Sequence, residues 1–343
     1  MLYKFSSANS PDYSHPLYKT PYNSRLIFLT GLLICSWAAF PQQLSNPVPQ
    51  VPTNAVIPTN FSQMRPPEGT RIFRDIPYVT NGHPRQKLDL YLPPNGTNLP
   101  LVVWIHGGAW LAGSKEMCRA LPLLNGGFAI ASINYRLSQH AIFPAQLQDC
   151  KAAIRWLRAH AHEYGIDPDR IGVWGESAGG HLAALVGTTG DITEFDVGEN
   201  LHVSSAVQAV CDWFGPTDFT TMNNSPELLS RNPENLPEAR LIGGPVHENK
   251  DRARRANPIT YVTKDDPPFL IMHGDNDNVV PINQSELLVE ALKQTGVKVK
   301  YHVVKGGGHG FGAPQQLNMV RQFFIEHLRP SDRPIDGTQS KTP

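Results

Sequence analysis

This chain of 343 residues has little cysteine, no excess of charge of either sign and no long apolar run. Lysine and arginine together number 30, as do aspartate and glutamate, so the formal net charge is zero. A chain with no basic field lacks the electrostatic attraction that holds nucleic acid or an anionic membrane surface. We therefore expect a neutral or small substrate and no nucleic-acid partner. Apolar residues make up 40% of the chain, which is enough for one large core.

The cysteines are only four, and none has the CxxC or Cys/His spacing of a zinc ligand set, so no metal site is expected. Cys35 lies in an N-terminal apolar run, which leaves three cysteines in the body of the chain. An odd number argues against a disulfide framework, so we expect buried or free thiols. A single pair between Cys118 and Cys150 is the alternative.

The N-terminal apolar run spans residues 26–40 and is shorter than the roughly 18–20 residues that a helix needs to cross a bilayer, so no stable membrane span is expected. Three basic residues and one acidic residue precede it, and Ser36-Trp37-Ala38 resembles a small-x-small cleavage site. This is the pattern of a secretory signal, which predicts an exported protein, periplasmic or secreted, that begins near Ala39. The alternatives are an uncleaved segment that anchors the protein in the membrane, and no targeting role.

The chain divides further by composition. After the signal-like segment 1–40, residues 41–67 hold seven prolines and few periodic apolar positions, which is typical of an extended linker. Residues 68–330 carry the regular patterns of a folded domain, and residues 331–343 are expected to form a flexible tail.

Strand and helix patterns alternate through the folded domain. Alternating apolar and polar residues predict half-buried antiparallel strands at 72–79 and 87–92. Continuous apolar runs predict buried strands, and apolar residues at helical spacing predict helices. These strands are expected at 101–105, 128–134, 171–174, 207–214, 269–272 and 297–304, and the helices at 146–164, 182–186, 285–294 and 315–328. Such alternation indicates an α/β fold with a mostly parallel central sheet and helices on both faces.

The pentapeptide Gly175-Glu176-Ser177-Ala178-Gly179 matches the G-x-S-x-G pattern. In this pattern a serine stands at the tip of a sharp strand-to-helix turn, where flanking glycines let the chain pass close on both sides. The match alone is weak, but a predicted buried strand precedes it and a predicted helix follows it. We therefore predict that Ser177 is a nucleophile, with an ordinary glycine-rich turn as the alternative.

The segment His106-Gly107-Gly108-Ala109-Trp110 directly follows the predicted strand 101–105. Acyl transfer develops negative charge on the former carbonyl oxygen, so the site needs preorganised N–H donors. We predict an oxyanion hole made by the backbone amides of Gly107, Gly108 and Ala178; a simple strand-to-helix turn is the alternative. His106 itself is interpreted as a structural hydrogen-bonding residue of this loop and not as a base.

A serine hydroxyl also needs a base, and the base needs a carboxylate to orient it. His181 lies one turn into the helix behind Ser177, so we expect it to pack. His309 lies in a glycine-rich loop immediately after the last predicted strand, where it can reach the serine, and we predict it as the base. The acid is in His273-Gly-Asp-Asn-Asp-Asn-Val-Val-Pro281, which leaves Asp275 and Asp277 open at this point. The order Ser, Asp, His is that of the α/β-hydrolase fold.

The four motifs HGGAW, GESAGG, HGDNDNVVP and GGGHGF together resemble those of the α/β-hydrolase carboxylesterases. They are most similar to esterases related to hormone-sensitive lipase and to bacterial feruloyl and acetylxylan esterases. The resemblance covers about residues 70–328. It implies a serine carboxylesterase that acts on small-molecule or carbohydrate esters through an acyl-enzyme, without metal or cofactor. The family spacing H-G-x-x-D-x-x-V-P implies Asp277 as the acid, with Asp275 capping a turn.

The resemblance also implies a small cap over the site, formed by about residues 219–266, which show no clear strand. Trp213 and Phe214 open this connection and, with Trp110, are candidates for the substrate pocket, although core packing is favoured for Trp213 and Phe214. The modest size of the cap predicts a preference for short acyl chains.

Three other functions fit parts of the same pattern. A peptidase of the prolyl-oligopeptidase type shares these motifs, but it carries a large propeller domain and only about 65 residues precede this fold. An amidase similar to arylformamidases is the second alternative. The third is an inactive hydrolase used as a binding module, which would be expected to have lost one of the three catalytic residues.

Overall fold

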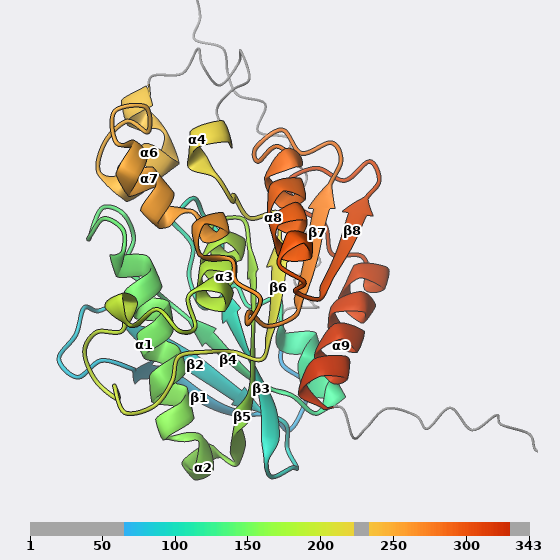
Figure 1. Cartoon of the computed structure of the whole chain (residues 1–343). Helices are drawn as coiled ribbons and strands as arrows, with labels where there is room; N and C mark the ends of the chain where they lie inside the picture. The colour runs from blue at the N-terminus through green and yellow to red at the C-terminus, as the bar shows by residue number, and fades with distance from the viewer. Residues whose placement is uncertain (1–64, 223–232, 330–343) are drawn as a thin grey trace, which may run out of the picture. The chain divides into compact units, whose positions relative to one another are not determined.

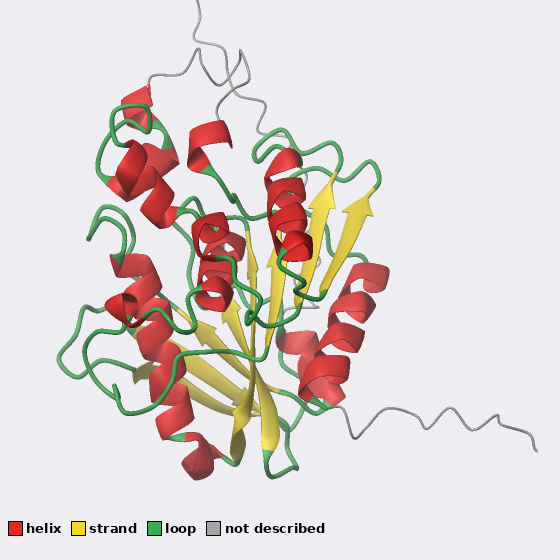
Figure 2. Ribbon diagram, viewed as in Figure 1, coloured by secondary structure: helices red, strands yellow, loops and turns green. Residues whose placement is uncertain are grey.

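A computed structural model describes residues 65–222 and 233–329 of the chain. The predicted signal-like segment 1–40, most of the linker 41–67 and the tail 331–343 lie outside the described residues. Figure 2 shows strands in the middle of this part of the chain, with helices around them. No helix among the described residues combines the length and the apolar character that crossing a bilayer requires.

The eight predicted strands are present and form one sheet in the order β1-β2-β4-β3-β5-β6-β7-β8. Antiparallel pairing is confined to β1 with β2 and β2 with β4, and the other neighbours are parallel. This confirms the mostly parallel α/β fold. The strands are β1 (Arg71–Pro77), β2 (Lys87–Leu92), β3 (Leu99–Ile105), β4 (Ala129–Ile133), β5 (Ile166–Glu176), β6 (Ala209–Trp213), β7 (Phe269–Gly274) and β8 (Val299–Val304).

The predicted helices are also present, and one of them is divided. The predicted helix 146–164 is interrupted at His160, which separates α1 from α2. The α-helices are α1 (Ala145–Ala159), α2 (Ala161–Tyr164), α3 (Ala178–Thr188), α4 (Phe219–Met222), α6 (Pro237–Ile242), α7 (Lys250–Ala256), α8 (Asn283–Gln294) and α9 (Pro314–Leu328). Shorter 3-10 helices are η2 (Leu121–Gly126), η3 (Thr193–Phe195), η4 (Pro233–Asn235) and η5 (Pro258–Tyr261).

The central strand β3 is buried on both faces, so its side chains alternate between two cores. Leu101, Val103 and Ile105 pack into a cluster with residues of α1, α3 and α8. Val102 and Trp104 point to the opposite face and pack with residues of α9 and η2. The helices therefore cover both faces of the sheet, as Figure 1 shows.

The region predicted to form the cap, residues 219–266, contains the short helices α4, α6 and α7 and no strand among its described residues. In Figure 1 these helices lie toward the end at which the arrows of β6, β7 and β8 point. Residues 223–232 of the predicted cap lie outside the described part.

The three cysteines of the folded domain are buried thiols, as expected. Cys118, Cys150 and Cys211 are free and buried, so the alternative pair between Cys118 and Cys150 does not form.

Candidate active site

Ser177 lies at the junction between β5 and α3, in a backbone conformation that side chains rarely adopt. Its φ is 54° and its ψ is −122°. The turn is tight, because a Cβ atom on Gly175 would lie 2.1 Å from the carbonyl oxygen of Gly179. The N–H of Ser177 donates to the carbonyl of Trp213 on β6 at 2.8 Å. The predicted strand–turn–helix context of the G-x-S-x-G motif is therefore present.

Three side chains from loops distant in sequence meet at this turn. The Nε2 atom of His309, in the loop after β8, lies 2.9 Å from Ser177 Oγ. The Nδ1 atom of the same ring lies 2.7 Å from Oδ2 of Asp277, in the loop after β7. The Asp277 side chain has no exposed surface, whereas that of His309 is 20% exposed. The hydroxyl, the imidazole and the carboxylate thus form one hydrogen-bonded chain.

The carboxylate of Asp277 is surrounded by donors. Its Oδ1 accepts the backbone N–H groups of Val279 at 2.8 Å and Val280 at 2.9 Å. Its Oδ2 also lies 3.3 Å from Nε2 of the buried His273. Burial by itself would raise the pKa of Asp277, but the hydrogen bonds from His273 and His309 outweigh it and hold the pKa well below its ordinary value. Asp277 is therefore ionised at neutral pH and accepts the Nδ1–H of the histidine.

Asp275, the other candidate for the acid, points elsewhere. Its Oδ1 accepts the backbone N–H of Gly306 at 2.6 Å, at the start of the loop that carries His309. The structure thus places Asp277, and not Asp275, against the imidazole, while Asp275 caps a turn.

Of the three predicted oxyanion donors, Gly107 and Ala178 lie beside the serine, and Gly108 follows Gly107 in the same loop. A Cβ atom on Gly107 would lie 3.4 Å from Ser177 Cβ, so this peptide passes close to the hydroxyl. Among the described residues, no acceptor takes the N–H of Gly107 or of Gly108. Ala178 is the first residue of α3, where a backbone N–H has no partner within the helix. The three amides thus have no acceptor among the described residues, and those of Gly107 and Ala178 adjoin Ser177.

Two other histidines considered in the sequence, His106 and His181, are structural, as expected. His106 is buried and its Nδ1 lies 2.7 Å from the carbonyl of Gly107. His181 is fully buried, and its Nε2 lies 2.7 Å from the carbonyl of Ala256. Burial lowers the pKa of each to about 4, so both rings are neutral at pH 7.

The aromatic residues predicted for the substrate pocket lie mainly in the core. Trp213 is 0% exposed and packs on Trp174, with ring centroids 5.0 Å apart, so its prediction as a pocket residue is wrong. Trp110 and Phe214 are each only 2% exposed. Phe214 packs edge-on against the His309 ring, with centroids 4.7 Å apart, and so supports the base. When a strand is apolar and buried on both faces, its sequence does not indicate which side chains contact a ligand and which lie in the core.

Two contacts near the site could not be predicted from the sequence: the pair of Arg119 with Glu176 and the contact of His273 with Asp277. Arg119 donates from Nε to the Glu176 carboxylate at 2.8 Å and from Nη1 to the carbonyl of Phe311 at 3.3 Å. It therefore links the turn of Ser177 to the loop of His309. Burial raises the pKa of Glu176, and Arg119 opposes part of that rise. Neither this pair nor the contact from His273 to Asp277 follows from a local pattern.

The arrangement can perform nucleophilic acyl transfer. An ionised, buried carboxylate holds the imidazole in the tautomer whose Nε2 can accept the serine proton, and unpaired amides adjoin the nucleophile. The described residues contain no group of three or more His, Cys, Asp or Glu side chains that could hold a metal ion.

Comparison with known proteins agrees with this geometry. A model of the family described as BD-FAE matches residues 88–292. The probable carboxylic ester hydrolase LipM of Mycobacterium tuberculosis is 35% identical over 279 residues, which cover 75% of this chain and 63% of LipM. Esterase LipQ of the same organism is 33% identical, covering 74% of this chain and 61% of its own length. The chain thus spans about three fifths of these curated relatives.

Solved structures of esterases are also similar to this chain. A truncated carbohydrate esterase from gut microbiota is 40% identical, with a TM-score of 0.71 over 76% of this chain and 98% of that one. The propionate-bound esterase Est2 of Thermogutta terrifontis is 28% identical, with a TM-score of 0.60 over 76% of this chain and 96% of that one.

The strain at Ser177 predicts an unusual order of stability. At an ordinary position, alanine is more stable than glycine by roughly 0.5–1 kcal/mol. At Ser177 the φ of 54° disfavours any Cβ atom, so we expect Ser177→Gly to exceed Ser177→Ala by about 1 kcal/mol in free energy of unfolding. Urea unfolding of the two variants measures this difference. The ordinary order, with alanine the more stable, would show that the turn is unstrained.

Proposed function

We infer the function from the premise that this chain belongs to the BD-FAE family, whose model its residues 88–292 match. We propose that it is a carboxylic ester hydrolase that acts through an acyl-enzyme on Ser177. The observation that carries this proposal is the hydrogen-bonded chain from Ser177 through His309 to Asp277, with distances of 2.9 Å and 2.7 Å. An inactive binding module does not require such a chain, and no observation favours a peptidase or an amidase.

In the proposed mechanism, Ser177 Oγ attacks the ester carbonyl carbon while His309 Nε2 takes the hydroxyl proton. The carbonyl oxygen becomes an oxyanion that accepts hydrogen bonds from the N–H groups of Gly107, Gly108 and Ala178. The intermediate expels the alcohol, which receives the proton from His309. Water, deprotonated by the same imidazole, then attacks the acyl-enzyme, and the acid departs as the proton returns to Ser177.

The proposed substrates are short-chain or carbohydrate-linked esters. The 40% identity to a carbohydrate esterase supports a sugar-linked alcohol. The propionate bound in the Est2 structure is a short-chain carboxylate, and it supports short acyl chains here. The candidate aromatic walls Trp110 and Phe214 are packed in the core, which leaves them unavailable to line a long acyl tunnel.

A panel of esters tests the activity and its range. We expect turnover of acetylated xylan or feruloyl esters, and kcat/KM to fall from acetate through butyrate to palmitate esters of one alcohol. Ser177→Ala is expected to lower kcat by about 10⁶-fold, as loss of a triad serine does in proteases. Ser204→Ala, which changes an exposed serine outside the site, is the matched control. A palmitate optimum contradicts the acyl preference, and near-normal turnover by Ser177→Ala contradicts the mechanism.

The two loop aspartates give opposite predictions. An amide at 277 keeps the shape but can hold the wrong histidine tautomer, so Asp277→Asn should lower kcat by about 10⁴-fold. Asp275→Asn should mainly lower stability, because Asp275 accepts the backbone N–H of Gly306. Kinetics at matched folded fraction, with urea unfolding, compare the two. A larger loss of kcat in Asp275→Asn would reverse the assignment.

Export is a separate proposal, supported by the basic leader, the short apolar run 26–40 and the small residues near its end. N-terminal sequencing of protein from the producing cells should find a mature chain that begins near Ala39. An intact Met1 on protein in the cytoplasmic fraction would refute it.

A further inference from the structure

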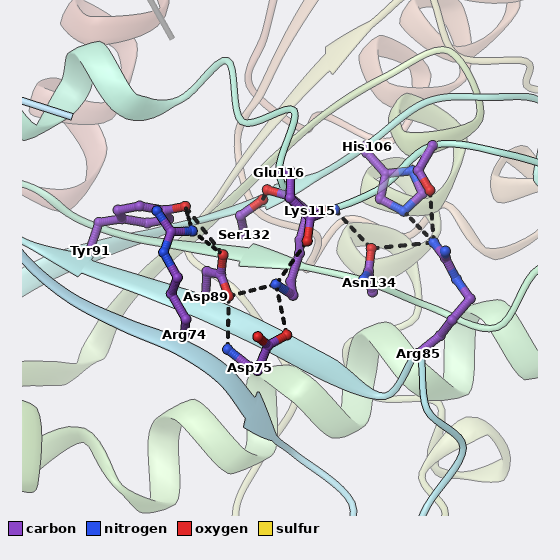
Figure 3. Close-up of polar contacts among 11 residues, drawn as sticks. Arg74, Asp75, Arg85, Asp89, Tyr91, His106, Lys115, Glu116, Ser132 and Asn134 are labelled. Atoms are coloured by element: carbon purple, nitrogen blue, oxygen red, sulfur yellow. Dashed lines mark hydrogen bonds and ion pairs between the residues drawn. The ribbon is translucent and has the colours of Figure 1, made fainter. Parts of the chain in front are cut away.

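The ring of His106 connects the proposed oxyanion hole to a charged side chain outside the site. Its Nδ1 lies 2.7 Å from the carbonyl oxygen of Gly107, and its Nε2 lies 3.1 Å from Nη2 of Arg85. Figure 3 shows the Arg85 guanidinium aimed at this ring. A carbonyl can only accept and a guanidinium can only donate. Both contacts therefore require the same form of His106, with the proton on Nδ1 and the lone pair on Nε2.

This hydrogen bond fixes the orientation of one oxyanion donor. The carbonyl of Gly107 and the N–H of Gly108 belong to one planar trans peptide, in which they point in opposite directions. When the carbonyl is held toward His106, the N–H of Gly108 faces the other way. A Cβ atom on Gly113 would lie 2.3 Å from Gly107 O and 2.5 Å from His106 Nδ1, so the loop also closes over this hydrogen bond.

Arg85 is itself held in place by backbone groups. Its Nε donates to the carbonyl of Tyr135 at 2.8 Å, and its Nη2 donates to the carbonyl of Gly113 at 2.9 Å. The Tyr135 ring stacks on His106, with centroids 4.4 Å apart and planes at 15°, and its hydroxyl donates to the carbonyl of His106 at 3.0 Å. The guanidinium and the imidazole are thus fixed relative to the same loop.

The far end of the loop is held by the same network. Asn134 Oδ1 accepts from Arg85 Nη2 at 3.2 Å and from the backbone N–H of Lys115 at 2.8 Å. The ammonium of Lys115 is buried against Asp89 at 2.7 Å. Arg74 pairs with the other oxygen of Asp89 at 2.9 Å, with no contact to the His106 ring (Figure 3).

We propose that Arg85 is a positioning residue of the oxyanion hole: it donates to His106 Nε2, which keeps the proton on Nδ1 and so holds the Gly107–Gly108 peptide with its N–H toward the oxyanion. The inference rests on the proposed function. Arg85 touches no reacting atom, so it acts only on transition-state stabilisation through the peptide. Its loss should therefore lower kcat with little change in KM.

The test compares Arg85→Gln with Arg74→Gln, since both remove a guanidinium from one network. Arg85→Gln should lower kcat on a p-nitrophenyl acetate substrate about 10- to 100-fold, below the ~10²–10³-fold cost of deleting a donor outright. Its KM should stay within about twofold. Arg85→Lys, which keeps a cationic donor, should recover part of the loss. Arg74→Gln should match the wild type in kcat and KM. All rates are taken at matched folded fraction from thermal melting.

A second readout separates positioning from a general loss of structure. A trifluoromethyl ketone accepts Ser177 Oγ at its carbonyl carbon, and the serine proton passes to His309, so the adduct carries an oxyanion in the same hole. Its inhibition constant should rise in Arg85→Gln by the factor by which kcat/KM falls. In ¹⁵N spectra of the wild type, His106 should be protonated at Nδ1 and unprotonated at Nε2, and Arg85→Gln should shift that proton toward Nε2.

The outcomes are distinct. The inference is overturned if Arg85→Gln has a kcat within twofold of the wild type or an unchanged inhibition constant. It is also overturned if His106 of the wild type is protonated at Nε2. An equal loss in Arg74→Gln also overturns it, because the effect is then general. If the wild type hydrolyses no ester, the proposed function fails, whereas the tautomer measurement still tests the hydrogen bonds.

Discussion

The backbone of Ser177 has a conformation that its own side chain opposes, and the surrounding structure maintains it. The N–H of Ser177 donates to Trp213 on β6 at 2.8 Å, and its carbonyl accepts from His181 in α3 at 3.0 Å. These bonds tie both sides of the residue to rigid elements, so the hydroxyl projects beyond the end of β5. The rest of the site is arranged around that point. Because the carboxyl ends of parallel strands meet at one edge of a sheet, the loops after β3, β7 and β8 reach the same place.

Two buried carboxyl groups near this edge show how the number of hydrogen-bond donors changes the pKa. Asp212 has one acceptor bond, from the N–H of Gly215, while its Oδ2 has no partner among the described residues. Burial raises the pKa of Asp212 to about 6. Asp277 is also deprived of solvent, but it faces His309, His273 and two backbone amides, and its pKa is lowered. Asp277 therefore stays ionised to a lower pH than Asp212, at the position where the imidazolium of His309 would form.

The sequence predicted much of the fold because the relevant signals are local. Alternating patterns and continuous apolar runs located the eight strands, and the motifs located Ser177, Asp277 and His309, whose side chains lie within hydrogen-bonding distance in the structure. The resemblance to the carboxylesterases, through its H-G-x-x-D-x-x-V-P spacing, also favoured Asp277 over Asp275. The error at Trp213 arose where a fully buried strand has no polar face, so that the pattern does not say which side chains lie in the core.

What the sequence could not predict are contacts between residues with no shared pattern. Arg85 lies 21 positions before His106, in a turn of ordinary composition, and nothing local indicates that its guanidinium meets the imidazole. The link between Arg119 and Glu176 is of the same kind. Such pairs depend on the register of β2 beside β4 and on the path of the loops. They are decided by tertiary packing, which a single sequence does not display.

The proposed mechanism requires that Ser177, and no other residue, forms the covalent intermediate. Incubation with a fluorophosphonate, followed by proteolysis and mass spectrometry, measures this directly, because the serine oxygen displaces fluoride and keeps the phosphonyl group. We expect one adduct per chain, on the peptide that contains Ser177, with labelling slowed in His309→Gln and absent in Ser177→Ala. An adduct on another residue, or labelling that persists in Ser177→Ala, would contradict it.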